Sequence, residues 1–442
     1  MPRLELNPEK IYKIPNSIFI KNIDSYYLVI ATELANWLLL QNEKQLEIFE
    51  LLLSGKSIAE VLRNIPADMQ GDLLHVLVEL EAKKFECQEV NYPQEQGMYI
   101  YLTNRCNQRC RHCYMYAGEQ QEQELTTKEV LKVVRGFAES GGKVITFTGG
   151  EATLRPDFKE IVTFAKKNEL IVGVLSNGIA WPQEWMAWVK NTIDEVQISI
   201  DGYDAETYRY VRGKDTFNAA LDTVDRLINV GIRVTVAITP LMETLISKEN
   251  EYIKFAKQLI DRYEGKKFFV KFNTELMDGR TINPTKTEND KYRKSINQIK
   301  NACALCSEEK GFALDHKRNT IFNNCGYGGL SIASNGDIYF CNLIDKCACQ
   351  GNIRNMKFDE IIAISQKARK FSDISNLLPC KNCDLKYLCG GGCRVKNFKT
   401  LSKTIISKEE KGDFFVREPI CTEKYKEQIY RLMIRANNLF YQ

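Results

Sequence analysis

The chain has 442 residues, of which 44% are apolar and 27% charged, and its formal net charge is +4. This length predicts about three domains, and so weak a basic bias does not indicate a nucleic-acid partner. No apolar run approaches the roughly 18 residues of a membrane span, and the N-terminus contains no stretch typical of a signal peptide. We therefore expect a cytoplasmic protein that does not associate with membranes.

The first 90 residues predict a small α+β domain with a winged-helix order of elements. Short apolar runs predict strands at 11–14, 17–20 and 25–30. Apolar residues three and four apart predict helices at 43–53, 58–64 and 69–84. The polar residues 91–97, which include Pro93 and Gly97, predict a linker.

From residue 98 the pattern alternates between strand and helix at the spacing of βαβ units. The predicted strands are 98–103, 143–148, 171–175, 195–200, 232–238 and 267–272. The predicted helices between them lie near 126–140, 157–167, 183–191, 216–229 and 248–263. Repeated strand–helix units predict a parallel sheet, with the loops after the strands building a site at one edge. Residues 422–440 predict an amphipathic closing helix.

Three cysteines in one short loop, Cys106, Cys110 and Cys113, follow the first of these strands in a C-x3-C-x2-C pattern. Three thiolates suit three corners of a four-iron cluster and leave the fourth iron without a protein ligand. A closed ferredoxin cluster takes four cysteines, and a structural zinc ion takes four ligands. The loop therefore predicts an iron–sulfur cluster with an open iron, and a zinc loop or free thiols are the alternatives.

Fifteen cysteines are many for a chain without an export signal, and only three histidines accompany them. In a reducing cytosol such thiols are more often ligands than disulfides. Eleven of the fifteen lie beyond residue 300, so they predict a second site of chemistry. Cys87 stands alone and is interpreted as a small buried thiol.

Two kinds of motif follow the other strands. Thr148-Gly149-Gly150-Glu151 ends the second strand, and glycine lets the backbone approach a ligand closely because no Cβ intervenes. The third and fourth strands end in Ser176-Asn177-Gly178 and Ser199-Ile200-Asp201-Gly202. Ordinary turn chemistry is the alternative interpretation of each motif taken alone.

In combination, these features closely resemble the radical S-adenosylmethionine (SAM) enzymes, in which an open iron binds SAM and the cluster cleaves it to a 5′-deoxyadenosyl radical. The resemblance implies a partial (β/α)6 barrel over residues 98–300, with Cys106, Cys110 and Cys113 holding the SAM-binding [4Fe–4S] cluster. It places an aromatic residue near the adenine and an arginine on the SAM carboxylate. The residues that it assigns to SAM are Tyr114, Gly149, Gly150, Glu151, Ser176, Asn177, Ser199, Asp201 and Arg212.

The later cysteines resemble the SPASM domain, an extension that carries two auxiliary [4Fe–4S] clusters. The matching order is Cys325, Gly336, Cys341, Cys380-x2-Cys383-x5-Cys389-x3-Cys393 and Cys421. The resemblance implies that residues 301–442 bind a distal cluster through Cys380, Cys383, Cys389 and Cys421. It implies a proximal cluster on Cys325, Cys341 and Cys393, with Cys306 as the fourth ligand and Cys303, Cys347, Cys349 or the substrate as alternatives. A pair of zinc sites is the rival interpretation.

The segment 42–62 resembles the peptide-recognition domains of enzymes that modify ribosomally made peptides, and a DNA-reading winged helix is its structural rival. The whole chain is therefore predicted to be a radical SAM peptide maturase. It would bind a precursor's leader, abstract a hydrogen and form an intramolecular carbon–carbon or thioether crosslink, with flavodoxin or ferredoxin as electron donor. The alternatives are a sulfatase-maturing type of enzyme that makes formylglycine and a non-catalytic iron–sulfur electron carrier. No residue pattern indicates a catalytic acid or base.

Overall fold

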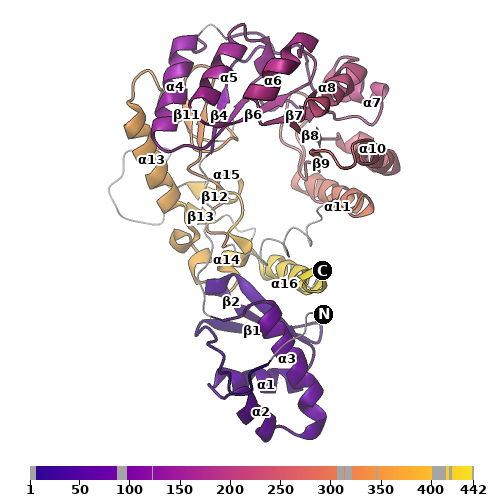
Figure 1. The fold of residues 1–442 in the computed structure, drawn as a ribbon, viewed down its shortest axis with the longest axis vertical. Coiled ribbons are helices and arrows are strands. Elements are labelled where there is room, and N and C mark those ends of the chain that lie inside the picture. Colours follow the sequence, from indigo (N-terminus) through magenta and orange to yellow (C-terminus); the bar gives the residue numbers. More distant parts are fainter. Residues whose placement is uncertain are drawn as a thin grey trace.

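The computed structural model describes residues 6–86, 97–121, 123–305, 313, 321–344, 347–400, 415–417 and 421–440. An N-terminal α+β unit lies at one end, a large sheet with its helices lies at the other, and the C-terminal cysteine-rich part lies between them (Figure 1). Cys87 and Cys306 fall outside the described residues. Among the described helices, none has the length and apolar character needed to cross a bilayer.

The N-terminal unit contains an antiparallel sheet in the order β1-β2-β3. Its elements are β1 (Ile18–Ile23), β2 (Tyr26–Ala31), β3 (Asn36–Leu40), α1 (Glu43–Leu53), α2 (Ile58–Asn64) and α3 (Gln70–Ala82). The three predicted helices are confirmed, whereas the predicted strand at 11–14 is wrong. This segment contacts the ends of two helices instead. The carbonyl of Lys10, just before it, accepts a hydrogen bond from the N–H of Ile58 at the start of α2, and the N–H of Lys13 donates to the Glu86 side chain after α3. The strand β3 carried no alternating pattern, because it is buried throughout its length.

The large sheet is built around six parallel strands. They are β4 (Gly97–Tyr101), β5 (Val144–Thr148), β6 (Ile171–Ser176), β7 (Glu195–Ser199), β8 (Arg233–Ile238) and β9 (Phe268–Phe272). Its helices are α4 (Thr127–Glu139), α5 (Phe158–Lys167), α6 (Met186–Thr192), α7 (Ala205–Arg212), α8 (Phe217–Asn229), α9 (Met242–Ser247), α10 (Glu249–Arg262) and α11 (Lys286–Ala302). Figure 1 shows these helices in an arc around the outside of the strands. The predicted strands and helices of this region are confirmed, and α7, α9 and α11 are additions.

The C-terminal part extends the same sheet. Its elements are β10 (Leu330–Ile332), β11 (Ile338–Tyr339), α13 (Phe358–Phe371), α14 (Lys386–Cys389), α15 (Arg394–Asn397), β12 (Phe398–Thr400), β13 (Phe415–Arg417) and α16 (Glu423–Phe440). The strand β10 pairs in parallel with β4, so the sheet order is β11-β10-β4-β5-β6-β7-β8-β9. One edge of the partial barrel is therefore covered by the C-terminal part, whereas β9 lies at the other edge.

The N-terminal sheet packs on both of its faces. On one face, Leu28, Trp37 and Leu39 belong to the same apolar core as the barrel and the C-terminal part. On the other, Val29 and Leu38 pack with the N-terminal helices in a second core. Side chains of successive strand residues point to opposite faces, so the sheet lies between two apolar layers. The N-terminal unit is thus held against the rest of the chain by a continuous core.

A buried ion pair lies at this junction. Lys83 Nζ is 3.1 Å from Glu79 Oε2, and both side chains are almost fully buried. Lys83 also donates to the carbonyl oxygen of Trp37 at 3.0 Å and to Oδ1 of Asn437 in α16. Asn437 in turn donates to Glu79 at 3.3 Å. Helix α3, strand β3 and the closing helix α16 are therefore joined through two charges that have no access to water.

We predict that Lys83→Met will destabilise the N-terminal unit by about 3 kcal/mol, because removing one member of a buried pair leaves the other charge uncompensated. Chemical denaturation followed by tryptophan fluorescence measures the loss. Lys44→Met is the matched control, since Lys44 pairs with Asp68 on the exposed surface and should leave the denaturation midpoint unchanged. Equal midpoints for the two variants would contradict the structural role of the buried pair.

Candidate functional site

The loop with Cys106, Cys110 and Cys113 follows β4 at the carboxyl edge of the sheet. The N–H of Cys113 donates to the carbonyl oxygen of Cys110 at 3.3 Å, which folds the last two cysteines into a turn. Burial raises the pKa of Cys106, and it raises the pKa of Cys110 to about 11. The neighbouring thiols add to both shifts. Iron ligation requires thiolates, so binding at this loop would release protons.

Gly149 and Gly150 allow the backbone at the start of the cysteine loop to pack directly against them. The N–H of Gly150 donates to the carbonyl of Thr103 at 2.8 Å, and the N–H of Glu151 donates to that of Arg105 at 2.9 Å. A Cβ on Gly149 would lie 2.4 Å from the Thr103 oxygen, and one on Gly150 would lie 2.4 Å from the Arg105 oxygen. Gly149 also has a φ of +134°, which side chains disfavour. The close approach expected for a ligand is made here by the backbone just before Cys106.

Glu151 is buried and joins the ends of two strands. Its carboxylate accepts hydrogen bonds from the Thr153 hydroxyl at 2.6 Å, the Ser176 hydroxyl at 2.8 Å and the Asn177 N–H at 2.7 Å. Burial raises the pKa of Glu151, although these donors oppose the shift. The amide nitrogen of Asn177 lies 4.0 Å from Cys106 Sγ. The motifs after β5 and β6 are therefore brought together beside the first cysteine, as the parallel register requires.

Asp201 and Arg212 form a buried pair behind the same loop. Arg212 Nε is 2.7 Å from Asp201 Oδ2. Its Nη1 donates to Gln108 Oε1 at 3.1 Å and lies 3.7 Å from Cys110 Sγ. Burial alone would raise the pKa of Asp201, but the charge of Arg212 and the neighbouring His112 hold it below the usual value. The structure thus places Arg212 against a predicted cluster ligand.

Two residues at this loop had no predicted role: His112, which lies within it, and Arg280, which contacts it. His112 Nε2 lies 3.2 Å from Asp201 Oδ2, and among the described residues its Nδ1 is buried without a hydrogen-bond partner. Arg280 donates to the carbonyl oxygens of Cys110 at 3.2 Å and Ala117 at 2.5 Å. Arg280 follows β9, about 170 residues along the chain from its first acceptor. Only the fold brings these groups together.

The remaining residues predicted to bind SAM are Tyr114 and Ser199. The Tyr114 hydroxyl is 3.3 Å from that of Tyr101, which donates to the carbonyl of Asn342 at 2.6 Å. Tyr114 is therefore directed toward the C-terminal part and the peptide after Cys341. Ser199 is half-buried at the end of β7, opposite Ala237 of β8.

Four of the later cysteines form one group, which we call the proximal group: Cys325, Cys341, Cys347 and Cys393. Cys325 and Cys393 share a hydrogen bond, as do Cys341 and Cys347, and Cys341 also lies near Cys393. Cys325 donates to Cys393 and lowers the pKa of that thiol to about 6. The backbone N–H of Arg394 donates to Cys325 Sγ at 3.3 Å. Four thiols gathered in this way fit four corners of an iron–sulfur cluster.

Two of the other candidates for the fourth proximal ligand, Cys349 and Cys303, are not in this group. Cys349 is exposed, and its thiol donates to the carbonyl of Gly351 at 3.2 Å. Cys303 is buried beside α10, where it donates to Ile253 at 3.6 Å. The predicted ligand Cys306 lies outside the described residues.

We call the four cysteines of the predicted distal cluster the distal group: Cys380, Cys383, Cys389, which ends α14, and Cys421, which lies just before α16. The N–H of Cys383 donates to the carbonyl of Cys380 at 3.0 Å. The Cys389 thiol lies 3.9 Å from the hydroxyl of Tyr425, in the first turns of α16. Burial raises the pKa of Cys383 to about 12. Among the described residues, no three His, Cys, Asp or Glu side chains are arranged to hold a single metal ion.

Asp384 connects the distal group to the N-terminal unit. Its carboxylate accepts a hydrogen bond from Tyr430 of α16 at 2.6 Å, and Lys21 of β1 lies 3.5 Å from the same oxygen. Its backbone carbonyl accepts a hydrogen bond from Thr32 at 2.8 Å. The N-terminal sheet therefore contacts the peptide directly after Cys383.

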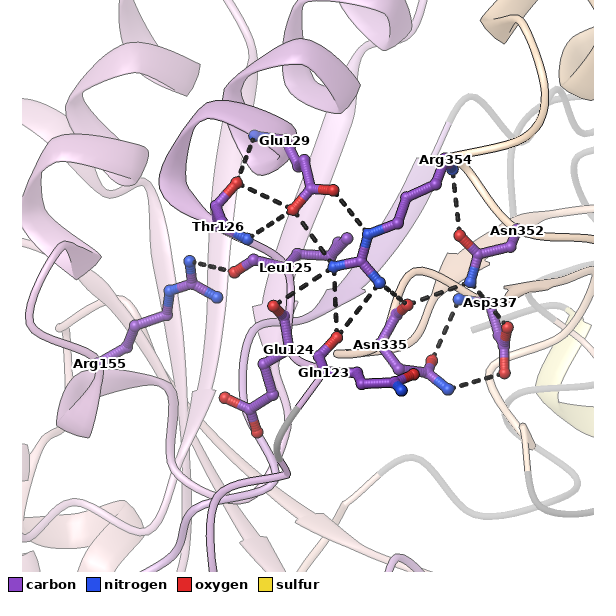
Figure 2. A network of polar contacts seen from close by, with 10 residues as sticks. All are labelled: Gln123, Glu124, Leu125, Thr126, Glu129, Arg155, Asn335, Asp337, Asn352 and Arg354. Carbon is purple, nitrogen blue, oxygen red and sulfur yellow. Dashed lines mark hydrogen bonds and ion pairs between the residues drawn. The ribbon is translucent and has the colours of Figure 1, made fainter.

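Arg354 connects the C-terminal part to residues 123–129, which follow the cysteine loop (Figure 2). Its Nε is 2.6 Å from Glu129 Oε1, and its guanidinium donates to the backbone carbonyl of Glu124 at 3.4 Å. The Glu124 carboxylate accepts hydrogen bonds from the Thr103 hydroxyl and, at 2.6 Å, from the N–H of Asn104. The hydrogen bond with Arg354 lowers the pKa of Glu129 to about 2, so this contact is fully present above about pH 4.5 and is lost as the pH falls toward 2.

Two family models match this chain. Residues 100–256 match the radical SAM superfamily, and residues 324–384 match the SPASM iron–sulfur cluster-binding domain. The first match contains the cysteine loop and the motifs after β5, β6 and β7, and the second ends just after Cys383. The chain therefore contains a radical SAM domain followed by a SPASM domain, and the predicted fold class is confirmed.

Among curated proteins, the sporulation killing factor maturation protein SkfB of Bacillus subtilis is 38% identical over 142 residues, which are 32% of this chain and 34% of SkfB. The GTP 3′,8-cyclase of Actinobacillus succinogenes is 30% identical over 189 residues, which are 41% of this chain and 56% of the cyclase. The chain thus matches about a third of one relative and just over half of the other.

Two solved structures share the fold. The structure of anSMEcpe with bound AdoMet gives a TM-score of 0.55 at 19% identity, covering 78% of this chain and 99% of that one. Streptococcus suis SuiB gives 0.50 at 15% identity, covering 93% of this chain and 100% of that one. At these identities the likeness establishes the fold and nothing finer.

We predict that Arg354→Ala will loosen the segment before Cys106. Losing hydrogen bonds worth about 1 kcal/mol should speed local amide exchange near Asn104 and Gly118 roughly fivefold, as measured by hydrogen–deuterium exchange. Arg293→Ala removes an exposed pair with Asp290 on α11 and serves as the control. Unchanged exchange in the Arg354 variant would show that this contact does not support the loop.

Proposed function

We propose that this chain is a radical SAM enzyme that modifies a ribosomally synthesised precursor peptide. It would abstract a hydrogen from a core residue and close an intramolecular crosslink, either carbon–carbon or thioether. The observation that carries the proposal is the combination, in one packed chain, of a three-cysteine loop, two further cysteine groups and an N-terminal sheet in contact with one of them. The relative SkfB is named as the maturation protein of a killing factor, which supports this class.

The radical SAM domain alone does not decide the substrate, because function depends on the site and not on the fold. Relatives that share it are named for a killing factor and for GTP. A peptide substrate is proposed here because the N-terminal unit lies against the SPASM domain through Asp384 and a continuous core. We propose that this unit binds the leader, that the core segment reaches the barrel, and that flavodoxin or ferredoxin supplies electrons.

The three-thiol loop fits a cluster with an open iron, since three thiols lie within one short loop, which is held by contacts from several segments. With SAM bound, such a cluster supplies the 5′-deoxyadenosyl radical that abstracts the hydrogen. We propose that Cys106, Cys110 and Cys113 are its ligands. We assign binding and orientation of SAM to Tyr114, Gly149, Gly150, Glu151, Ser176, Asn177, Ser199, Asp201 and Arg212. In addition, Arg212 and Asn177 would fix the positions of Cys110 and Cys106 through the contacts described above.

We propose two auxiliary [4Fe–4S] clusters, which makes three in all. The distal group, Cys380, Cys383, Cys389 and Cys421, would hold one. The proximal group would hold the other, with Cys347 as its fourth ligand in preference to Cys306, because Cys347 is the thiol that shares a hydrogen bond with Cys341. A proximal cluster with four cysteine ligands has no open iron for the substrate.

The function is tested by incubating anaerobic enzyme, SAM and dithionite with each short peptide encoded beside the gene. We expect 5′-deoxyadenosine and a product lighter by two hydrogens, and we expect neither from the Cys106→Ala, Cys110→Ala, Cys113→Ala triple variant. Mass spectrometry measures both. If every such peptide keeps its mass while 5′-deoxyadenosine is formed, the peptide-maturase proposal is wrong.

The same product distinguishes the sulfatase-maturing alternative. Oxidation of a serine to formylglycine also removes two hydrogens, but it creates an aldehyde, whereas a crosslink does not. The product should therefore be inert to a hydrazide reagent, and its tandem mass spectrum should lack fragment ions between the two joined residues. A hydrazide adduct would support formylglycine formation instead.

We predict about twelve iron atoms per chain for three four-iron clusters. Cys347→Ala should alter the electron paramagnetic resonance signal of the proximal cluster, because one ligand is lost, whereas Cys349→Ala should not. Iron analysis and spectroscopy of the reduced enzyme make the measurement. About four iron atoms per chain would refute both auxiliary clusters, and a spectral change confined to the Cys349 variant would refute the choice of Cys347.

A further inference from the structure

Arg394 is a buried cation beside the cysteines of the C-terminal part. It directly follows Cys393 of the proximal group, and only 1% of the residue is exposed. Its backbone N–H donates to Cys325 Sγ at 3.3 Å, so its main chain contacts a second thiol of that group. A charged side chain is rarely buried unless its surroundings compensate the charge. The groups around the guanidinium therefore indicate what the residue does.

The guanidinium is held by backbone carbonyls from three segments. Its Nη1 donates to Gly390 at 2.9 Å and to Gly392 at 2.6 Å. Its Nη2 donates to Asn323 at 3.1 Å, and its Nε donates to Ser372 at 2.9 Å. Hydrogen bonds from a charged donor are stronger than neutral ones, so four of them fix the position of the side chain. Because each carbonyl is a neutral dipole, these bonds orient the positive charge and do not neutralise it.

The loop 390–392, three glycines between Cys389 and Cys393, makes this arrangement possible. The φ values of the three glycines are +63°, +74° and +74°, a left-handed conformation that other residues disfavour. A Cβ on Gly390 would also lie 2.7 Å from the Cβ of Phe322. The chain therefore turns tightly here, and two of the loop's carbonyls reach the same nitrogen of the guanidinium.

The glycine loop joins one predicted ligand of each auxiliary cluster. Cys389 belongs to the distal group and Cys393 to the proximal group, and three residues separate them. Four residue steps of fully extended chain span at most about 14 Å, and a tight turn spans less. The cation bound to this loop therefore lies near both cysteine groups.

The charges around Arg394 agree with this position. Burial lowers the pKa of Arg394, and nearby groups that can carry negative charge oppose that shift. These groups are Cys325, Cys380, Asp373 and Cys393. They include thiols of the proximal and of the distal group. Water and salt screen such interactions little in a buried place, so the cation in turn stabilises negative charge on both groups.

We propose that Arg394 is a positioning residue shared by the two auxiliary clusters, and that its charge raises the reduction potential of both. Reduction adds negative charge to a cluster, and net charge is one of the factors that set a cluster's potential. A fixed, buried cation therefore favours the reduced form. The effect should be larger at the proximal cluster, because Arg394 adjoins Cys393. This inference rests on the auxiliary clusters of the proposed function and specifies how their potentials are set.

The competing explanation is that Arg394 only holds the glycine loop in place. Two substitutions separate its charge from its hydrogen bonds. Arg394→Gln removes the charge but keeps an amide that can donate to carbonyls, whereas Arg394→Lys keeps the charge and loses the planar fork. If the charge sets the potentials, the Gln variant should shift them and the Lys variant should not. If the role is only structural, both variants should behave alike.

The test uses the full-length enzyme with its clusters in an anaerobic redox titration, in which electron paramagnetic resonance follows each reduced cluster. With iron content equal to that of the wild type, Arg394→Gln should make reduction of the proximal cluster about tenfold less favourable. That change is a fall of about 59 mV for a one-electron couple. The distal potential should fall by less, and Arg394→Lys should keep both potentials close to those of the wild type.

Lys396→Gln is the matched control. It removes a cation from the same helix, α15, but this cation is partly exposed and pairs with Glu275 at 2.9 Å. Solvent screens such a charge, so both potentials should shift much less than in the Arg394→Gln enzyme. A shift as large as that of Arg394→Gln would show that the buried position is not what matters and would overturn the proposal.

Asp373→Asn is a second variant, which leaves Arg394 in place. It removes a negative charge that acts on Arg394, so both potentials should rise, and it decides the outcome if Arg394→Gln does not retain its iron. Unchanged potentials in Asp373→Asn, unchanged potentials in an iron-replete Arg394→Gln enzyme, or equal falls in the Gln and Lys variants would each overturn the proposal and leave the clusters standing. About four iron atoms in the wild type would instead remove the auxiliary clusters themselves.

Discussion

The candidate site depends on one close backbone contact, between Gly149–Gly150 and the peptide that leads into Cys106. Two hydrogen bonds of 2.8 and 2.9 Å join the segments, and any Cβ would collide with carbonyl oxygens there. Because β4 and β5 are adjacent and parallel, the strand ends arrive at the same edge and the contact can form. This contact fixes the start of the cysteine loop, and contacts from other segments position its middle. Arg212 and Arg280 reach the middle of the loop from α7 and from the segment after β9.

The same loop is supported from the SPASM side. Arg354 contacts the backbone of Glu124, whose carboxylate accepts hydrogen bonds from the residues before Cys106. Asp384 links the distal group to the N-terminal sheet. The hydrogen bond between Thr32 and Asp384 is buried, where such bonds are stronger than at an exposed surface, whereas the Arg354 contacts lie at the surface. The N-terminal unit and the distal group therefore share one continuous core, and the cysteine loop is supported from a second side.

Much of the fold could be predicted from the sequence, because barrel strands and amphipathic helices have strong periodicities. The cysteine loop and the glycine motif could be found because their residue types are rare at such spacing. The sequence could not indicate Arg280 or His112, since an arginine in a loop and a histidine between cysteines have no periodic signal. The strand β3 was missed because both of its faces are buried, which removes alternation. The segment 11–14 was wrongly predicted as a strand because its apolar residues pack against helices and pair with no neighbouring strand.

Gly149 and Gly150 were expected to let the backbone approach a ligand. The absence of a Cβ correctly indicated a close approach, but the sequence did not indicate which group approaches. In the structure it is the chain itself, because the backbone of Thr103 and Arg105 lies against both glycines. The firm packing of the N-terminal unit has a related consequence for substrate choice. A leader bound to this unit, as proposed above, would place its following residues at a fixed position, because the unit is packed against the SPASM domain. An extended chain advances at most about 3.6 Å per residue, so the number of residues between the proposed leader and core would determine which side chains can reach the barrel. If the N-terminal unit were attached by a flexible linker, the spacing between leader and core would not determine which residues reach the barrel. The shared core and the buried ion pair hold the unit in place.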